Sequence, residues 1–162
     1  MTDCSSAPTR PATLDDIPFI DALRAQEWES VGFIPKTRYE MEVEGKSSGT
    51  ILVVSENGEP CGFVYATHSP TMTSVTQLAV AQDARRIERG KALVTAIQDV
   101  ADHKGHYGLR CRVAADLEAN AFWQAIGFDQ VGEGMGRFLW KPAGPKSRLV
   151  RVYERLTVPR LL

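Results

Sequence analysis

The chain has 162 residues, 43% of them hydrophobic and 24% charged, with a formal net charge of −1. This length predicts one domain with a sizeable core, and the near-neutral charge argues against a general attraction to nucleic acid or to an anionic membrane. The three cysteines are widely spaced, with no C-x-x-C pair, and no apolar leader opens the chain, so we expect a cytoplasmic protein without a disulfide framework or a membrane partner.

The first elements are expected to be a strand, a helix and a short second helix, at residues 9–12, 14–30 and 37–44. Thr13 and Asp16 have the spacing of a capping box at the start of the first helix, and apolar residues then recur at helical spacing. Residues 1–8 are small and polar, which predicts a flexible tail, so the domain is expected to span residues 9–162.

The middle of the chain predicts three successive antiparallel strands, at residues 50–55, 60–67 and 74–80. Apolar and β-branched residues dominate these segments, as is typical of strands. Asn57-Gly58 stands between the first two, and this dipeptide tolerates the positive φ angles of a tight hairpin turn.

The second half predicts a helix at residues 89–104 and then a strand at 108–114. A strand that leaves a helix of this length can pair in parallel with the strand at 74–80, which makes a β-α-β unit. A short helix and two strands follow, at residues 117–126, 128–140 and 149–156. The predicted fold class is therefore α/β with a mixed sheet.

The turn that follows Val80 has the features of an anion-binding site. We expect the backbone N–H groups around residues 86–92 to lack strand and helix partners, and a helix start adds the positive end of its dipole. Gly90 permits a close backbone approach, and positive charge comes from Arg85, Arg86, Arg89 and Lys91. These features predict a ligand with a diphosphate, although a solvated basic helix start with a glycine used for packing explains them about equally well.

Two segments of the chain follow longer spaced patterns: residues 85–90 read Arg-Arg-Ile-Glu-Arg-Gly, and residues 116–128 read Asp-x-x-Ala-x-x-Phe-Trp-x-x-x-Gly-Phe. The first resembles the acyl-CoA loop, Arg/Gln-x-x-Gly-x-Gly/Ala, of the GCN5-related N-acetyltransferase (GNAT) superfamily. The second is similar to that family's signature Asn-x-x-Ala-x-x-Phe-Tyr-x-x-x-Gly-Phe. Glu88 stands in place of the first loop glycine, and Trp123 stands in place of the tyrosine.

The resemblance covers residues 9–140, because the opening Thr-Arg-Pro-Ala-Thr segment and the Cys-Gly-Phe-Val strand also agree in order. It implies a single-domain GNAT fold, a mixed and mostly antiparallel sheet with a central β-α-β acyl-CoA-binding unit and flanking helices. The segments predicted above give this sheet six or seven strands. The resemblance also implies acetyl-CoA as co-substrate, bound where the strands at 74–80 and 108–114 splay apart.

The resemblance further implies which residues hold the acetyl-CoA. Backbone amides near Leu78 and Val80 would bind the thioester carbonyl and the pantetheine arm, and a preorganised N–H there stabilises the oxyanion of the transition state. The diphosphate would lie on the loop that contains Arg85, Arg86, Arg89, Gly90, Lys91 and Ala92.

The sequence leaves more than one candidate for the catalytic acid and for the catalytic base. In the family a tyrosine protonates the departing thiolate, but the indole of Trp123 is too weak an acid, so solvent or another group replaces it or the position only packs against CoA. Asp116 and His68 are candidates for the base, although an N-cap explains Asp116 better and a surface position beside a turn explains His68 about equally well. The spacing of the histidines and carboxylates predicts no metal site.

The acceptor side is expected to be formed by the first two helices and a loop at 136–150, with Glu27, Trp28, Phe33, Arg38 and Tyr39 along its wall. Trp28 and Phe33 can equally serve only to cover the sheet. The leading hypothesis is an N-acetyltransferase that acts on an amine of a small molecule, an amino acid or a protein.

Two alternatives stay open. A GNAT-like enzyme of a mobile element that modifies nucleic acid would use the basic cluster Lys141, Lys146, Arg148 and Arg151, and the net charge of −1 argues against it. A non-catalytic acyl-CoA-binding module would account for Glu88 and Trp123. GNAT domains often form homodimers, and residues 158–162 are a candidate contact between two copies.

Overall fold

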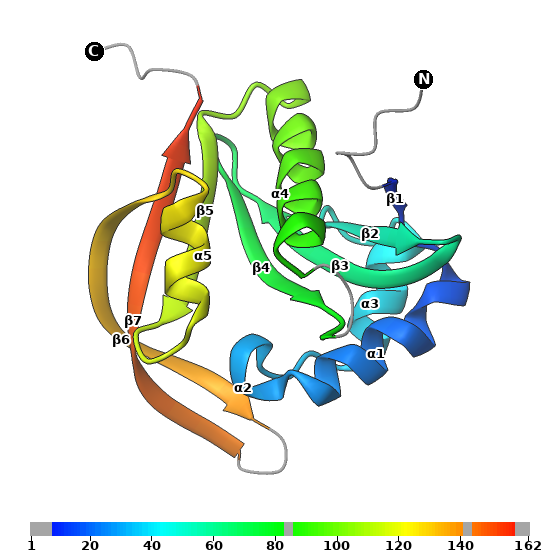
Figure 1. The fold of residues 1–162 in the computed structure, drawn as a ribbon, viewed down its shortest axis with the longest axis horizontal. Coiled ribbons are helices and arrows are strands. Elements are labelled where there is room, and N and C mark those ends of the chain that lie inside the picture. The colour runs from blue at the N-terminus through cyan, green and yellow to red at the C-terminus, as the bar shows by residue number, and fades with distance from the viewer. Residues whose placement is uncertain (1–7, 83–85, 141–143, 158–162) are drawn as a thin grey trace.

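The computed structural model describes residues 8–82, 86–140 and 144–157 (Figure 1). In chain order its elements are β1 (Thr9–Pro11), the 3₁₀ turn η1 (Leu14–Asp16), α1 (Ile17–Gln26), α2 (Trp28–Val31), α3 (Lys36–Val43), β2 (Thr50–Glu56), β3 (Glu59–His68), β4 (Thr73–Val80), α4 (Arg86–His103), β5 (Gly108–Ala114), α5 (Ala119–Ala125), β6 (Asp129–Trp140) and β7 (Gly144–Leu156).

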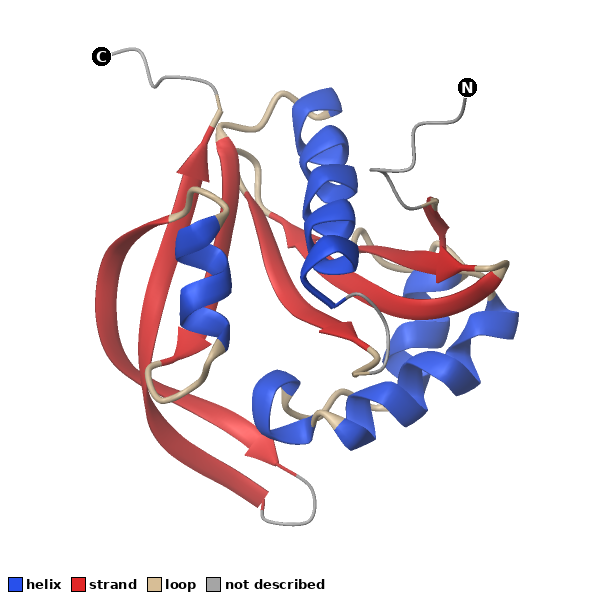
Figure 2. Ribbon diagram, viewed as in Figure 1, coloured by secondary structure: helices blue, strands red, loops and turns tan. Residues whose placement is uncertain are grey.

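The strands form one seven-stranded sheet in the order β1-β2-β3-β4-β5-β7-β6 (Figure 2). Neighbouring strands are antiparallel except for β4 and β5, which are parallel and connected through α4. The predicted antiparallel set and the predicted β-α-β unit are therefore both confirmed. Asn57 and Gly58 have φ angles of 53° and 80°, which confirms the tight turn between β2 and β3.

Helices cover the two faces of the sheet and enclose two separate cores. On one face α4 and α5 bury a cluster that includes Leu93, Ile97 and Trp123. On the other face α1 and α3 bury a cluster that includes Ile20 and Tyr39. Each helix contributes its apolar stripe, as the helical spacing of these residues predicts. None of the helices in the described ranges is long and apolar enough to cross a membrane.

The N-terminal segment differs from the single helix expected over 14–30. Asp16 accepts a hydrogen bond from the backbone N–H of Thr13 at 2.7 Å, as the capping box predicts, but the first turn is 3₁₀. The helix is then interrupted at Glu27, which has φ −104° and ψ 30°. Of the predicted tail, residues 1–7 lie outside the described residues, and the carbonyl of Pro8 accepts a hydrogen bond from Ser55 N at 3.0 Å.

The predicted loop at 136–150 is largely a strand hairpin. β6 and β7 pair from Asp129↔Glu154 to Trp140↔Gly144. β7 pairs with β5 only from Val150 onward, so residues 144–149 pair with β6 alone. Pro145 lies in this outer part, where the missing N–H of a proline costs no bond to β5. Local breaker residues therefore did not predict where this strand begins.

Candidate functional site

A bulge opens the sheet between β4 and β5. The β3–β4 register passes from Ala66↔Val75 to Tyr65↔Gln77, so Thr76 is an extra residue in β4. Such a residue bends its strand and increases its twist. The parallel ladder with β5 ends at Val75↔Cys111, directly before the bulge. The two strands diverge from there on, and Figure 1 shows them separating toward the end of β4.

Two backbone amides of β4 point into this gap. Ala81 N donates a hydrogen bond to Cys61 O at 2.8 Å, on the β3 side. Because alternate residues of a strand direct their N–H groups to the same neighbour, those of Leu78 and Val80 point away from β3. They lie beyond the last β4–β5 pair, so they face the gap that the bulge creates.

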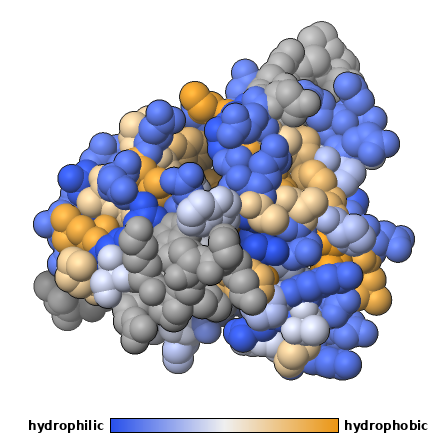
Figure 3. Space-filling view, turned by 90° about the horizontal axis from the view of Figure 1, so that it is seen from below, coloured by the Kyte–Doolittle hydropathy of each residue, from blue (hydrophilic) through white to orange (hydrophobic). Residues whose placement is uncertain are grey.

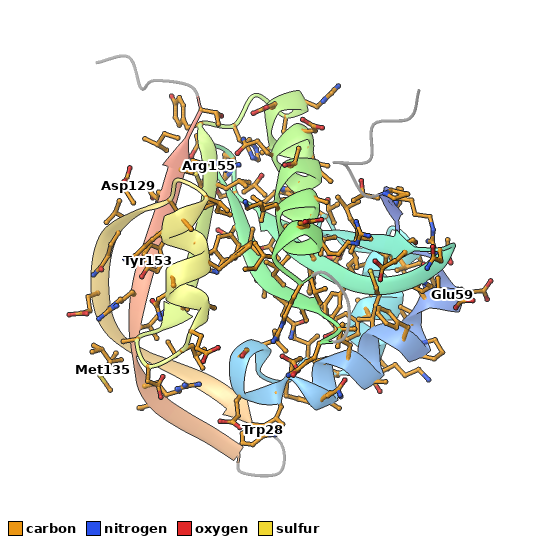
Figure 4. All side chains as sticks on the ribbon, in the orientation of Figure 1. Trp28, Glu59, Asp129, Met135, Tyr153 and Arg155 are labelled. Carbon is orange, nitrogen blue, oxygen red and sulfur yellow. The ribbon has the colours of Figure 1, made fainter. Side chains whose placement is uncertain are left out.

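Helix α2 lies across the open end of the gap. Gln77 Nε2 on β4 donates to Val31 O at 3.0 Å, and Arg148 Nη1 on β7 donates to Glu29 O at 3.0 Å. The helix is thus tied to strands on both sides of the opening. Trp28, at the start of α2, lies near the outer end of the β6–β7 hairpin (Figure 4).

The free amides at the start of α4 lie in the first part of the predicted range 86–92. Helix α4 begins at Arg86, three residues before the predicted start, so the N–H groups of Gly90, Lys91 and Ala92 lie one turn inside it and bond to carbonyls four residues earlier. The amides left over at a helix start belong to its first turn, here residues 86–88. Glu88 lies in this first turn and favours the helical conformation, because a glutamate is a good helix former and is stabilised near the positive end of the dipole.

Gly90 packs α4 against α5. A Cβ atom on this residue would lie 3.1 Å from Cζ of Phe122. The close approach is therefore made by an aromatic ring, which supports the packing explanation of this glycine.

The basic residues near this helix start are paired with carboxylates. Arg86 Nη2 lies 2.5 Å from Glu27 Oε1, and Arg89 Nη2 lies 2.8 Å from Glu56 Oε1. Arg85 lies outside the described residues, and Lys91 is exposed. An anion at this helix start would meet two guanidinium groups whose charge is already partly compensated.

The carboxylate of Glu27, a residue predicted for the acceptor wall, lies beside this helix start. Its carboxylate is buried and also accepts a hydrogen bond from Gln82 Nε2 at 3.1 Å. It lies at the break between α1 and α2, so it connects that break to the segment after β4.

The structure separates the three predicted catalytic residues. Trp123 is 4% exposed, and its ring lies 4.9 Å from that of Phe128, so it is a core residue. Asp116 is not the N-cap of α5, because Glu118 has that position. The Asp116 carboxylate is 75% exposed and accepts a hydrogen bond from Arg148 Nη2 at 2.6 Å.

His68 lies at the closed end of the β4–β5 pair. It is opposite Thr73, the first residue of β4, which still pairs with β5. Its ring nitrogens lie 2.9 Å from the hydroxyls of Thr50 and Thr73. Burial lowers the pKa of His68, with a smaller contribution from the charge of Lys104. The ring is therefore held within the sheet and away from the gap.

The aromatic residues predicted for the acceptor wall have mostly structural contacts. Tyr39 is fully buried, and its hydroxyl donates to Gln77 Oε1 at 2.6 Å. Burial raises the pKa of Tyr39. The guanidinium of Arg24 lies over the Phe33 ring, with Cζ of Arg24 4.7 Å from the ring centroid.

A cavity of about 380 Å³ lies beside the bulge, between α3 and strands β3 and β4. It is lined by Ile34, Pro35, Thr37, Arg38, Met41, Tyr65, Thr67 and Thr76. Burial, together with a hydrogen bond donated to Glu42, raises the pKa of Tyr65 to about 12. Of this set, Arg38 alone was expected at the acceptor side, because no local spacing in the sequence connects residues 34–41 with residues 65–76.

The described residues hold no group of three histidine, cysteine or acidic side chains suited to a metal ion. The thiols of Cys61 and Cys111 are buried, as expected for core residues of their strands.

Comparison with known proteins places this geometry in a family. The family model described as "Acetyltransferase (GNAT) family" matches residues 17–128. A search of curated proteins finds no match. Among solved structures, the chain is similar to a probable acetyltransferase from Staphylococcus epidermidis, with TM-score 0.77, 11% identity and coverage of 93% of this chain and 99% of that one.

Two further structures have the same fold. Arabidopsis thaliana NAA60 in complex with acetyl-CoA matches with TM-score 0.76 and 14% identity, over 94% of this chain and 99% of that one. A ribosomal-protein-alanine N-acetyltransferase from Brucella melitensis matches with TM-score 0.72 and 17% identity, over 92% of this chain and 99% of that one. Because the family model covers more than half of the sequence and the sheet opens at the β4 bulge, this chain belongs to the GNAT acetyltransferase family.

Proposed function

We propose that this protein is an acetyl-CoA-dependent N-acetyltransferase that acts on a primary amine of a small molecule, an amino acid or a protein. The observation that carries the proposal is the opening of the sheet at Thr76, with the N–H groups of Leu78 and Val80 facing the gap. One structural neighbour is a ribosomal-protein-alanine N-acetyltransferase, so protein amines are included among the proposed acceptors. Membership in the acetyltransferase family supports the proposal that the transferred group is an acetyl group.

The residues of the gap fit acetyl-CoA, which supplies the activated acetyl group. We assign the backbone N–H groups of Leu78 and Val80 to the thioester carbonyl and the pantetheine amides. A donor fixed by the strand needs no reorganisation when negative charge develops on the carbonyl oxygen, so it stabilises the transition state more than the ground state. The first-turn amides of α4, together with Arg86, are assigned to the diphosphate.

The acceptor amine is assigned to the cavity beside Thr76. The residues that line this cavity in the described part of the chain include hydroxyls but neither a carboxylate nor an imidazole. An amine must be neutral to attack, so we propose that its proton leaves to solvent. With Trp123 buried, the thiolate also receives its proton from solvent.

The cofactor assignment is tested by replacing a single amide. Ile87 is 64% exposed and is the second residue of α4, a position that proline also holds in α1 at Pro18. Ile87→Pro removes one first-turn N–H and keeps the helix, because proline is tolerated there. We expect acetyl-CoA affinity, measured by calorimetric titration, to fall about tenfold, the effect of one hydrogen bond to a charged group.

The matched control is Ile87→Ala, which removes the same side chain and keeps the amide. It should bind acetyl-CoA as the unmodified protein does. If both variants bind acetyl-CoA as tightly as the unmodified protein, the start of α4 is not part of the acetyl-CoA site.

Turnover is tested by thiol release from acetyl-CoA with a panel of amines, amino acids, peptides and polyamines. The proposal expects release with at least one acceptor class. Binding of acetyl-CoA without release for any amine would instead favour the non-catalytic module.

A further inference from the structure

We infer that the cavity beside Thr76 is built for an acceptor that carries a carboxylate as well as its amine, in the manner of a small free amino acid. The inference rests on the proposed function and goes beyond it by naming the acceptor class. It is carried by the way Arg38 is held at the cavity wall.

A chain of hydrogen bonds fixes one edge of Arg38. Its Nε donates to the Tyr65 hydroxyl at 3.2 Å, and that hydroxyl donates to Glu42 Oε2 at 2.5 Å. The other carboxylate oxygen, Glu42 Oε1, accepts a hydrogen bond from Gly49 N at 3.1 Å. Gly49 leaves room for this contact, since a Cβ there would overlap the Glu42 carboxylate.

The terminal nitrogens of the Arg38 guanidinium keep their N–H groups for a ligand. A guanidinium has five N–H groups, four of them on its terminal nitrogens. Within the described residues its one hydrogen bond is the bond from Nε to Tyr65. Arg38 is exposed and lines the cavity, so a planar pair of donors is offered to a ligand. This fork matches the two oxygens of a carboxylate.

The charge of the cavity also favours an anionic group. Arg38 is the charged residue among those that line it, and the others are apolar or hydroxyl side chains. The buried carboxylate of Glu42 accepts hydrogen bonds from the Tyr65 hydroxyl and the Gly49 amide, and its charge also acts on Arg38. It therefore holds Arg38 through Tyr65 without lining the cavity itself.

The size and direction of the cavity agree with a small zwitterion. Its volume of about 380 Å³ is at the lower end of the range for ligand pockets. Arg38 and Thr76 line the same cavity, so a carboxylate at Arg38 leaves the amine free to point toward the gap at the bulge. Ile34, Pro35 and Met41 offer an apolar surface to the rest of the molecule.

The test compares an apolar free amino acid with its amide, which keeps the amine and loses the negative charge. Thiol release is measured for both and expressed per concentration of neutral amine, because amidation lowers the pKa of the amine. For the unmodified protein we expect kcat/KM to be at least about tenfold higher for the amino acid than for its amide, mainly because KM is lower for the amino acid.

The variant Arg38→Gln should lower kcat/KM for the acid about tenfold and leave the value for the amide unchanged. Lys36→Gln, which removes a neighbouring exposed positive charge that does not line the cavity, should preserve the preference for the acid. Equal use of acid and amide by the unmodified protein, or an equal loss of both in Arg38→Gln, would overturn the inference.

The outcomes also separate this inference from the proposed function. Thiol release with peptides or polyamines but with neither the amino acid nor its amide would overturn the acceptor class and leave the transferase standing. Absence of release with every amine, despite binding of acetyl-CoA, would overturn both.

Discussion

The buried carboxylates of this protein connect different elements of the fold. Asp16 pairs with Arg10 on β1, Glu27 pairs with Arg86 at the start of α4, and Glu42 is held by Tyr65 and Gly49. A buried charge is tolerated when it is paired and hydrogen-bonded. Each of these residues therefore stabilises one particular arrangement of its neighbours.

Asp16 allows a prediction about pH. Its hydrogen bonds from Arg10, above all, hold its pKa below the ordinary value. A lowered folded-state pKa stabilises the folded protein above the ordinary carboxyl pKa of about 4, and this stabilisation is lost as the pH falls through the folded-state value. Asp16→Asn should lower the free energy of unfolding by about 1–2 kcal/mol at neutral pH.

Urea unfolding at several pH values checks this expectation. The difference between Asp16→Asn and the unmodified protein should shrink as the pH falls below about 4. Asp15→Asn, an exposed neighbour, is the control and should differ little at any pH. A constant difference across the pH range would contradict the role of the Arg10–Asp16 pair.

At the scale of elements, the gap depends on how β5 is held. β5 contacts β4 in parallel for three register pairs only, whereas it pairs with β7 along its whole length, from Gly108↔Leu156 to Ala114↔Val150. Its position is thus set mainly by β7. This leaves β4 free to bend at Thr76 without breaking the sheet.

Gly108 tests that arrangement. A Cβ on this residue would lie 2.2 Å from Arg155 O in β7, a contact with backbone that cannot move aside easily. Gly108→Ala should lower the free energy of unfolding by about 2–4 kcal/mol, through overpacking between the two strands. Thermal and urea unfolding measure the change.

The matched control is Gly134→Ala in β6, where an added Cβ meets no atom within 4 Å. It should change stability by less than about 1 kcal/mol. Similar stability of the two alanine variants would show that β5 and β7 are not in such close contact.

At the scale of the whole molecule, charge is balanced, with a formal net value of −1. Of the basic cluster proposed for nucleic acid, Arg148 is tied to Asp116 and Glu29, and Arg151 Nε lies 3.5 Å from Glu133 Oε1. Lys141 lies outside the described residues. The face shown in Figure 3 is mainly hydrophilic, with separate hydrophobic areas. Two of the four basic residues of the cluster therefore have a carboxylate beside them.

We therefore expect weak binding to nucleic acid. Fluorescence anisotropy with a labelled DNA duplex should show no saturable binding up to about 10 μM protein at about 150 mM salt, since specific and non-specific binding both depend on phosphate contacts. Tight binding that weakens steeply as salt is raised would restore the nucleic-acid hypothesis. A homodimer and a cytoplasmic location stay predictions.

Much of the fold could be predicted from the sequence, because its signals are local. The alternation along 108–114 and the Asn57-Gly58 turn each act over a few residues, and the structure has these elements where they were expected. Boundaries were less predictable. Helix α4 starts at Arg86, three residues before the predicted position, and its first turn contains Glu88, a helix former in a place where the family has glycine.

The candidate site could be predicted only in part. The sequence by itself determined the family, the mixed sheet and the β4 segment whose amides face the gap, since periodicity and motif spacing are properties of neighbouring residues. Only the tertiary structure decided that Trp123 is core, that His68 lies at the closed end of the strands, and that Arg38, Tyr65 and Thr76 share one cavity. The physical reason is that burial and the meeting of α3 with β3 and β4 depend on packing between segments distant in the chain, which no local pattern encodes.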